Sequence, residues 1–250
     1  MTGRTLLACF LRTYLVGAAF NTRGMQNVGM VYAMEPGLRV IYPDPAERRR
    51  ARRRYLQHYN THPFWTPLLV AVFLSLERQI AMGLFPRGVL DNVKNTTTYT
   101  LSAIGDSVFG GSLLVFWSLS TSLLLMHGEH RVAFCWALLW ITALQLFKLA
   151  TFFVGFKEGF KALGHLKRWD LINWGHRLKV LNAVLLCLVL SVAWPGIFSR
   201  PLWATSVGLL CMLAYMISRL HVSREIIAAC ILAILALHPW LEKLWGHLLK

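Results

Sequence analysis

Long apolar segments dominate the second half of the chain, and their lengths predict its architecture. Four of them, near residues 108–126, 132–156, 178–198 and 201–217, reach or approach the roughly 20 residues that an α-helix needs to cross a bilayer. A fifth and shorter apolar stretch covers residues 226–240. Because a helix satisfies its own backbone hydrogen bonds in lipid, we predict an all-α integral membrane protein with about four to five transmembrane helices.

The first 60 residues show shorter periodicities that are typical of helices lying at an interface. Apolar side chains share one helical face between residues 5 and 20, namely Leu7, Phe10, Leu11, Tyr14, Leu15 and Ala18. A second helical pattern runs from Met25 to Pro36, with Asn21 or Thr22 as its expected N-cap. We predict N-terminal amphipathic helices that lie in the cytoplasmic interface or pack on a partner subunit.

A strongly basic helix is expected next. Six arginines occupy the seven positions from Arg48 to Arg54, while Ala51, Tyr55 and Tyr59 form a narrow apolar stripe at intervals of four. We predict a surface helix whose arginines face lipid phosphates and the cytoplasm.

Two segments combine a membrane-like composition with features that interrupt a helix. Residues 64–76 are apolar but too short to span, and Pro63 and Pro67 flank their start. We predict a re-entrant hairpin or a broken helix there, which is allowed at membrane depth only where protein or water covers the backbone. Asp106 lies in a glycine-rich stretch beside a span, a pattern typical of an interrupted segment that lines a substrate path.

Charges between the apolar segments predict the orientation. Lysines and arginines are concentrated in residues 157–179 and in the first 60 residues, but are sparse in residues 127–131. The positive-inside rule therefore places the N-terminus in the cytoplasm and the 127–131 loop outside. We interpret residues 1–250 as one membrane domain, with cytoplasmic or interfacial helices in 1–60 and a membrane-embedded region in 61–250.

The composition agrees with a membrane protein. Apolar residues make up 56% of the chain and charged residues 15%, where a soluble domain carries about 25%. The net charge of +15 indicates contact with anionic lipids rather than nucleic acid, because the basic residues are interleaved with membrane segments. The sequence has no nucleotide-binding, hydrolase or metal-binding motif, so we expect no stand-alone catalytic site, no metal and no cofactor.

One lysine lies inside an apolar segment, where a charge is costly. We expect Lys148 to face the bundle interior, with Asp106 as its candidate partner. Snorkelling or packing against a subunit's backbone carbonyls is the alternative, and the sequence leaves both open.

Several short motifs follow one another over residues 5–163. They are Phe20-Asn21, Met25-Gln26-Asn27-Val28-Gly29, Tyr42-Pro43, Tyr59-Asn60-Thr61-His62-Pro63-Phe64, Leu76-Glu77-Arg78-Gln79, Gly105-Asp106-Ser107-Val108-Phe109-Gly110-Gly111 and Lys148-Leu149-Ala150-Thr151. In this order they resemble the IID component of the mannose-family sugar phosphotransferase system. Ser107 and Lys148 depart from that family's usual proline and arginine. The likeness fades after residue 163, and the chain looks shorter than is usual in the family.

The resemblance implies a function and a set of partners. IID pairs with a IIC membrane subunit, and the two bind and translocate a hexose or related sugar. Histidines of separate IIA and IIB phosphocarrier proteins carry the phosphoryl group to the sugar, so IID itself is not catalytic. The family's complexes are trimers of IIC–IID pairs in the bacterial cytoplasmic (inner) membrane.

Polar residues in the matched segments are the expected sugar contacts. Amides and carboxylates orient sugar hydroxyls, so the candidates are Gln26, Glu35, Asn60, Thr61 and Asp106. Asn60 and Thr61 also fit a helix cap, and Asp106 fits a packing counter-ion. The partner subunit is a further source of sugar contacts.

Two other functions stay open. One is a shortened IID-like protein that does not transport and acts in regulation or assembly. The other is a membrane-attached binder of anionic ligands that uses the arginines between Arg48 and Arg54.

Overall fold

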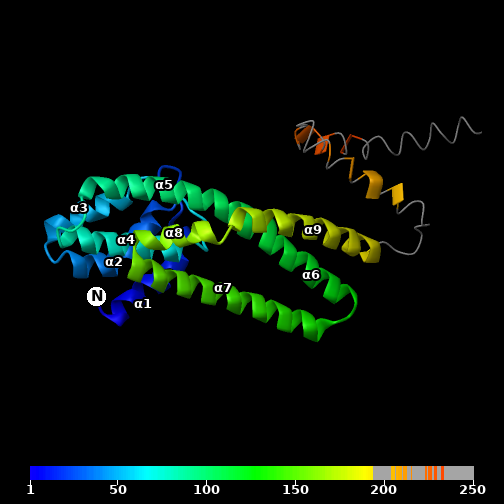
Figure 1. Cartoon of the computed structure of the whole chain (residues 1–250), viewed down its shortest axis with the longest axis horizontal. Coiled ribbons are helices and arrows are strands. Elements are labelled where there is room, and N and C mark those ends of the chain that lie inside the picture. The colour runs from blue at the N-terminus through cyan, green and yellow to red at the C-terminus, as the bar shows by residue number, and fades with distance from the viewer. Residues whose placement is uncertain are drawn as a thin grey trace, which may run out of the picture. The chain divides into compact units, whose positions relative to one another are not determined.

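The described part of the chain consists of helices joined by short loops, which confirms the predicted all-α class. The computed structural model describes residues 1–193 and, beyond them, only isolated positions between residues 204 and 233. The chain divides into two compact units, Met1–Val189 and Leu190–Lys250. The elements (Figure 1) are α1 (Gly3–Arg12), the 3₁₀ helix η1 (Thr13–Ala19), α2 (Asn27–Ile41), α3 (Pro45–Tyr55), α4 (Thr66–Ala81), α5 (Arg87–Gly105), the π helix η2 (Asp106–Leu113), α6 (Leu114–Met126), α7 (His130–Glu158), α8 (Phe160–Arg168) and α9 (Leu171–Ala193).

Helix α4 lies at the centre of the first unit. All of its residues are buried except Arg78, Gln79 and Ala81, and it contacts α1, α2, α5, α7 and α8. Gly155 of α7 lets the two helices approach closely, since a Cβ at that position would lie 3.0 Å from the Leu68 carbonyl oxygen. A helix that is apolar around its circumference is buried on all sides.

The expected break within residues 64–76 is wrong. Helix α4 runs without interruption for 16 residues, or about 24 Å at 1.5 Å per residue. Pro67 falls in its first turn, where the missing N–H costs no intrahelical hydrogen bond. The prolines therefore start this helix instead of breaking it, and the segment is apolar because protein surrounds it.

Three helical segments of the described chain are long and apolar enough to cross a membrane: Leu90–Met126, His130–Glu158 and Leu171–Ala193. The first contains the glycine-rich stretch around Asp106. The predicted interruption there is not a break, because the helix continues through η2 with wider π-type turns. The spans predicted at 201–217 and 226–240 fall on residues that the structure describes only at isolated positions.

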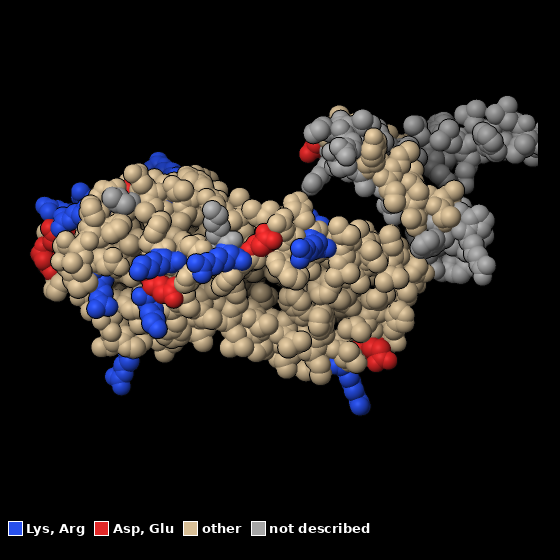
Figure 2. Space-filling view, in the orientation of Figure 1, with Lys and Arg blue, Asp and Glu red and all other residues tan. Residues whose placement is uncertain are grey.

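Helices α6 and α7 form an antiparallel hairpin (Figure 1). The Trp136 indole N–H donates to the Ser120 hydroxyl at 2.9 Å, which fixes the register of the pair. Figure 2 shows few charged side chains over this hairpin, whereas lysines and arginines gather over the helices of the opposite end. A hydrocarbon core 30 Å thick corresponds to ~20 helical residues. Counted from the loop that connects the two helices, such a core ends near Ser107 on one helix and near Thr151 on the other. We therefore expect residues near these two positions to share one membrane boundary.

Gly29 allows η1 to pack directly on α2. A Cβ at this position would overlap the backbone carbonyl of Val16, whereas a Cβ at Gly17 meets nothing within 4 Å. We expect Gly29→Ala to destabilise the purified chain by about 1–3 kcal/mol, because backbone atoms must shift to accommodate the methyl group. Thermal unfolding should show a lower Tm for this variant and an unchanged Tm for Gly17→Ala. Equal values for the two would contradict the described packing.

Candidate functional site at the membrane boundary

A network of asparagines positions the segment that precedes α4. The Asn21 side chain accepts a hydrogen bond from the Gly24 N–H at 2.8 Å and donates to Asn27 Oδ1 at 2.9 Å. Asn27 Nδ2 in turn donates to the Leu56 carbonyl at 2.6 Å. The cap expected at Asn21 or Thr22 is therefore wrong: α2 begins at Asn27, and Asn21 closes the turn before it.

Three of the expected sugar contacts are neighbours in this region. The Gln26 N–H donates to the Tyr59 carbonyl at 2.8 Å, and Gln26 Oε1 accepts from the Thr61 N–H at 3.2 Å. Thr61 is 2% exposed, and its hydroxyl has no partner among the described residues. Asn60 is half-buried. The Thr61 hydroxyl therefore keeps unused hydrogen-bonding capacity beside Gln26 and Asn60.

His62 connects this group to Asp106. A Cβ on Gly105 would overlap the His62 side chain, so the loop and the end of α5 are in direct contact. The His62 ring also stacks on Phe109, with ring centroids 5.3 Å apart. Burial lowers the pKa of His62; the Asp106 carboxylate opposes this shift, and the Lys148 ammonium adds to it. A neutral imidazole, which both donates and accepts hydrogen bonds, is therefore expected at neutral pH.

We call Gln26, Asn60, Thr61, His62 and Asp106 the boundary cluster. Asp106 is exposed and immediately precedes Ser107, where the hydrocarbon boundary is expected. The cluster presents amide, hydroxyl, imidazole and carboxylate groups beside aromatic rings, a combination that suits a polyhydroxylated ligand. The described residues contain no group of three or more His, Cys, Asp or Glu side chains that could hold a metal ion.

Lys148 does not pair with Asp106 as the sequence suggested. Its side chain is 9% exposed, and its Nζ lies 4.5 Å from the ring centroid of Tyr14 and 4.8 Å from that of Phe64. No ion pair within 4 Å joins it to an acid in the part of the chain that the structure describes. Two aromatic faces stabilise this cation instead.

Glu35 lies apart from the boundary cluster. It follows Gln26 by nine residues, or ~13 Å along α2. Its carboxylate accepts hydrogen bonds from Arg39 Nε and Arg52 Nε, each at 2.6 Å. Burial acts to raise the pKa of Glu35, but the hydrogen bonds from Arg52 and Arg39 outweigh it and the pKa is lowered. The carboxylate is thus bound to arginines within the chain.

A second buried carboxylate, Glu77, was not recognised from the sequence. It is fully buried and accepts hydrogen bonds from the Tyr42 hydroxyl at 2.8 Å and the Tyr55 hydroxyl at 2.9 Å. Arg54 donates to it from Nε at 3.1 Å and from Nη2 at 2.5 Å. Burial, and after it the charge of Glu77, raises the pKa of both tyrosines, so they remain donors. The available signals were an acid at the end of an apolar run and its place in the Leu76-Glu77-Arg78-Gln79 motif.

The basic helix α3 is therefore partly an internal element. Ala51, Tyr55 and Tyr59 are buried, which confirms the apolar stripe. Arg52 and Arg54, however, form ion pairs with Glu35 and Glu77 of the same chain. The helical wheel could not show this, because the acids that bind the two arginines lie on other helices.

Comparison with known proteins decides the family. The model of the "PTS system mannose/fructose/sorbose family IID component" matches residues 1–192. The chain belongs to this family. The resemblance inferred from the motifs is thereby confirmed, and the chain is an all-α membrane protein of the phosphotransferase system.

Relatives in several bacteria share part of the sequence. The mannose-specific EIID component of Escherichia coli is 30% identical over 162 residues, which are 64% of this chain and 56% of that protein. The fructose permease IID component of Bacillus subtilis is 27% identical over 162 residues, 64% of this chain and 57% of that protein. The sorbose-specific EIID component of Klebsiella pneumoniae is 30% identical over 114 residues, which are 45% of this chain and 42% of that protein. The chain thus spans little more than half the length of the first two relatives.

Two solved structures share the fold. A chain described as "Structure of membrane protein" superposes with a TM-score of 0.65 at 22% identity, covering 95% of this chain and 97% of that one. A chain from a complex of the mannose transporter ManYZ with a microcin superposes with a TM-score of 0.53 at 23% identity, covering 96% of this chain and 97% of that one.

Proposed function

We propose that this IID component pairs with a IIC membrane subunit and that the two bind and translocate a hexose or related sugar. Membership of the family supports the proposal, and so do its relatives, which are named for mannose, fructose and sorbose. The IIA and IIB phosphocarrier proteins supply the phosphoryl group, and this chain is not itself catalytic. We further propose a trimer of IIC–IID pairs that contacts anionic lipids.

The boundary cluster is the observation that carries this proposal. A sugar crossing a bilayer needs hydrogen-bonding groups at the depth where water ends. Asp106 is exposed there, and the Thr61 hydroxyl is buried without a partner among the described residues. Gln26, Asn60, Thr61 and Asp106 are the proposed sugar contacts, and we add His62 because it touches Gly105 and Phe109 beside them. Glu35 stays a proposed contact only if the partner subunit reaches its carboxylate beside Arg39 and Arg52.

We propose that the chain lies in the bacterial cytoplasmic (inner) membrane with its N-terminus in the cytoplasm. Lysines and arginines are concentrated before residue 60 and in residues 157–179, but are sparse in the loop between α6 and α7. The boundary cluster is then on the cytoplasmic side, where IIA and IIB act. The assignment of residues 1–250 to a single membrane domain stays a prediction.

Co-expression with a IIC subunit tests the function. A host that lacks its own mannose-family permease should take up a hexose only when it carries both chains together with IIA and IIB. The two membrane subunits should also co-purify in mild detergent. If the chains co-purify without supporting uptake of any hexose, hexosamine or ketose, the shortened, non-transporting alternative holds instead. If they do not associate, the proposed pairing is wrong.

The anionic-ligand alternative loses weight because of the structure of α3. Arg52 and Arg54 are bound to carboxylates of the same chain. The free charge of the helix is therefore smaller than six arginines suggest, and no second function is proposed for it.

A further inference from the structure

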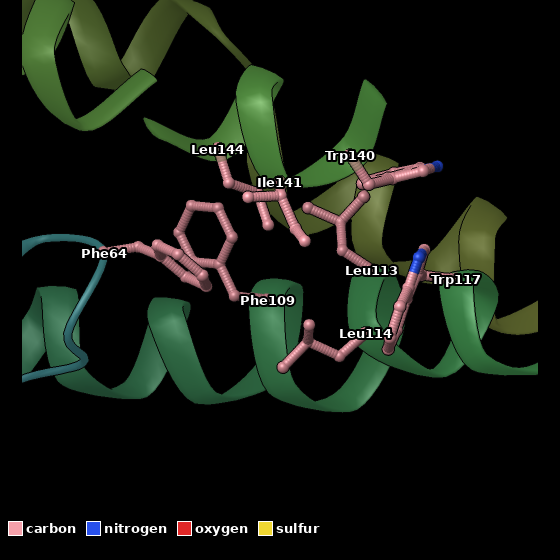
Figure 3. Close-up of a pocket in the computed structure, with 8 residues that line it drawn as sticks. All are labelled: Phe64, Phe109, Leu113, Leu114, Trp117, Trp140, Ile141 and Leu144. Carbon is pink, nitrogen blue, oxygen red and sulfur yellow. The ribbon is translucent and has the colours of Figure 1, made fainter. Parts of the chain in front are cut away.

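An apolar cavity of about 160 Å³ lies between η2–α6 and α7. Its wall contains aromatic and aliphatic side chains only, and Figure 3 shows Phe64 and Phe109 at one end and Trp117 and Trp140 at the other. Leu113 and Leu144 lie between these pairs. Because α6 and α7 belong to segments that are long and apolar enough to cross a membrane, we expect lipid acyl chains to reach the cavity.

The depth of this cavity matches one leaflet of a bilayer. Phe109 lies two residues beyond Ser107 at the boundary, and Trp117 lies eight residues further, or ~12 Å along the helix. Trp140 lies eleven residues from Thr151, or ~16 Å, which is about half of a 30 Å hydrocarbon core. The cavity therefore runs from the boundary towards the bilayer midplane.

A cation that has aromatic neighbours but no acidic partner among the described residues lies at the shallow end of the cavity. Lys148 follows Leu144 by one helical turn, so both side chains are on the same face of α7. Its Nζ lies 4.8 Å from the ring centroid of Phe64, which lines the cavity. The side chain is 9% exposed and has no acidic partner among the described residues. A buried ammonium in this position favours an anionic group beside it.

We propose that this cavity and Lys148 form a binding site for an anionic glycerophospholipid from the leaflet at this boundary. One acyl chain fills the cavity between Phe109 and Trp117, and the phosphate pairs with Lys148. This site is separate from the arginines of α3, and it does not depend on sugar transport.

Native mass spectrometry of the full chain in mild detergent tests the proposal. The probes are phosphatidylglycerol and phosphatidylcholine with identical acyl chains. The unchanged protein should retain phosphatidylglycerol at least about tenfold more tightly than phosphatidylcholine, as expected for one charge-assisted contact. Lys148→Gln should abolish this preference, and Lys148→Arg should keep it. Equal retention of the two lipids by the unchanged protein would overturn the proposal.

Two further variants separate this site from other sources of binding. Arg49→Gln removes the same charge from exposed α3 and should leave the preference intact; loss of the preference in this variant would place the lipid on α3. Leu144→Trp should fill the cavity and weaken the binding of both lipids, while its Tm stays within error of that of the unchanged protein. Complete displacement of phosphatidylglycerol by inorganic phosphate would identify an anion site without a chain-binding cavity and would overturn the proposal.

Discussion

Replacing Glu77 with glutamine is expected to destabilise the chain by about 3–5 kcal/mol, as is typical when one partner of a buried ion pair is removed. The Glu77 carboxylate is fully buried and accepts hydrogen bonds from Tyr42, Arg54 and Tyr55. Its loss leaves the Arg54 guanidinium, whose side chain is 16% exposed, without a counter-charge. Both tyrosine hydroxyls then donate to a neutral amide oxygen instead of a carboxylate, which weakens the polar attachment of α2 and α3 to α4.

Thermal unfolding of the purified full chain measures this effect. The matched control is Glu47→Gln, which removes an acid that pairs with Arg50 and Arg87 at the surface. Exposed pairs contribute at most about 1 kcal/mol, so the control should unfold close to the unchanged protein. Comparable losses of Tm in both variants would show that the buried network does not stabilise the fold.

The second large effect is expected at Asp106. Asp106→Asn keeps the shape of the side chain and removes the charge that, in the proposed function, accepts hydrogen bonds from sugar hydroxyls. Loss of one hydrogen bond to a charged group weakens binding by about 10- to 100-fold. We expect a matching rise in the sugar concentration that half-saturates uptake by the complex with IIC.

Glu129→Gln is the control for this effect. Glu129 is an exposed acid in the loop that closes α6 and α7, at the opposite membrane boundary. The Glu129→Gln variant loses the same charge as Asp106→Asn. The sugar concentration that half-saturates uptake should nevertheless stay unchanged. If Asp106→Asn and Glu129→Gln behave alike, Asp106 is a counter-ion or surface residue rather than a sugar contact.

The helices and their membrane character could be predicted from local patterns. Apolar run lengths indicated the spans within the described residues, and the i, i+4, i+8 stripe of Ala51, Tyr55 and Tyr59 identified the inner face of α3. Residues 64–76 were misjudged for a physical reason: a buried helix in a membrane protein and a short membrane segment have the same composition. Only the packing of α4 against its neighbours distinguishes the two cases.

The site was harder to predict because it depends on contacts between distant segments. The motif at Asn60 and Thr61 pointed to the loop of the candidate site, but the contact of His62 with Gly105 and its stacking on Phe109 required the fold. Glu35 and Glu77 look like free acids in the sequence, and the structure binds both to arginines of α3. Lys148 has two aromatic neighbours, one of them in the N-terminal segment, that no spacing rule indicates.

Protection of a single cysteine by sugar tests most directly whether the boundary cluster lies on the sugar path. Ser107→Cys, in a variant whose own cysteines are replaced, places an exposed thiol next to Asp106. In the complex with IIC, the transported sugar should slow maleimide labelling at this position several-fold and leave Glu129→Cys unaffected. Labelling at position 107 that is as fast with saturating sugar as without it, in a complex that still binds sugar, would contradict the assignment of the boundary cluster.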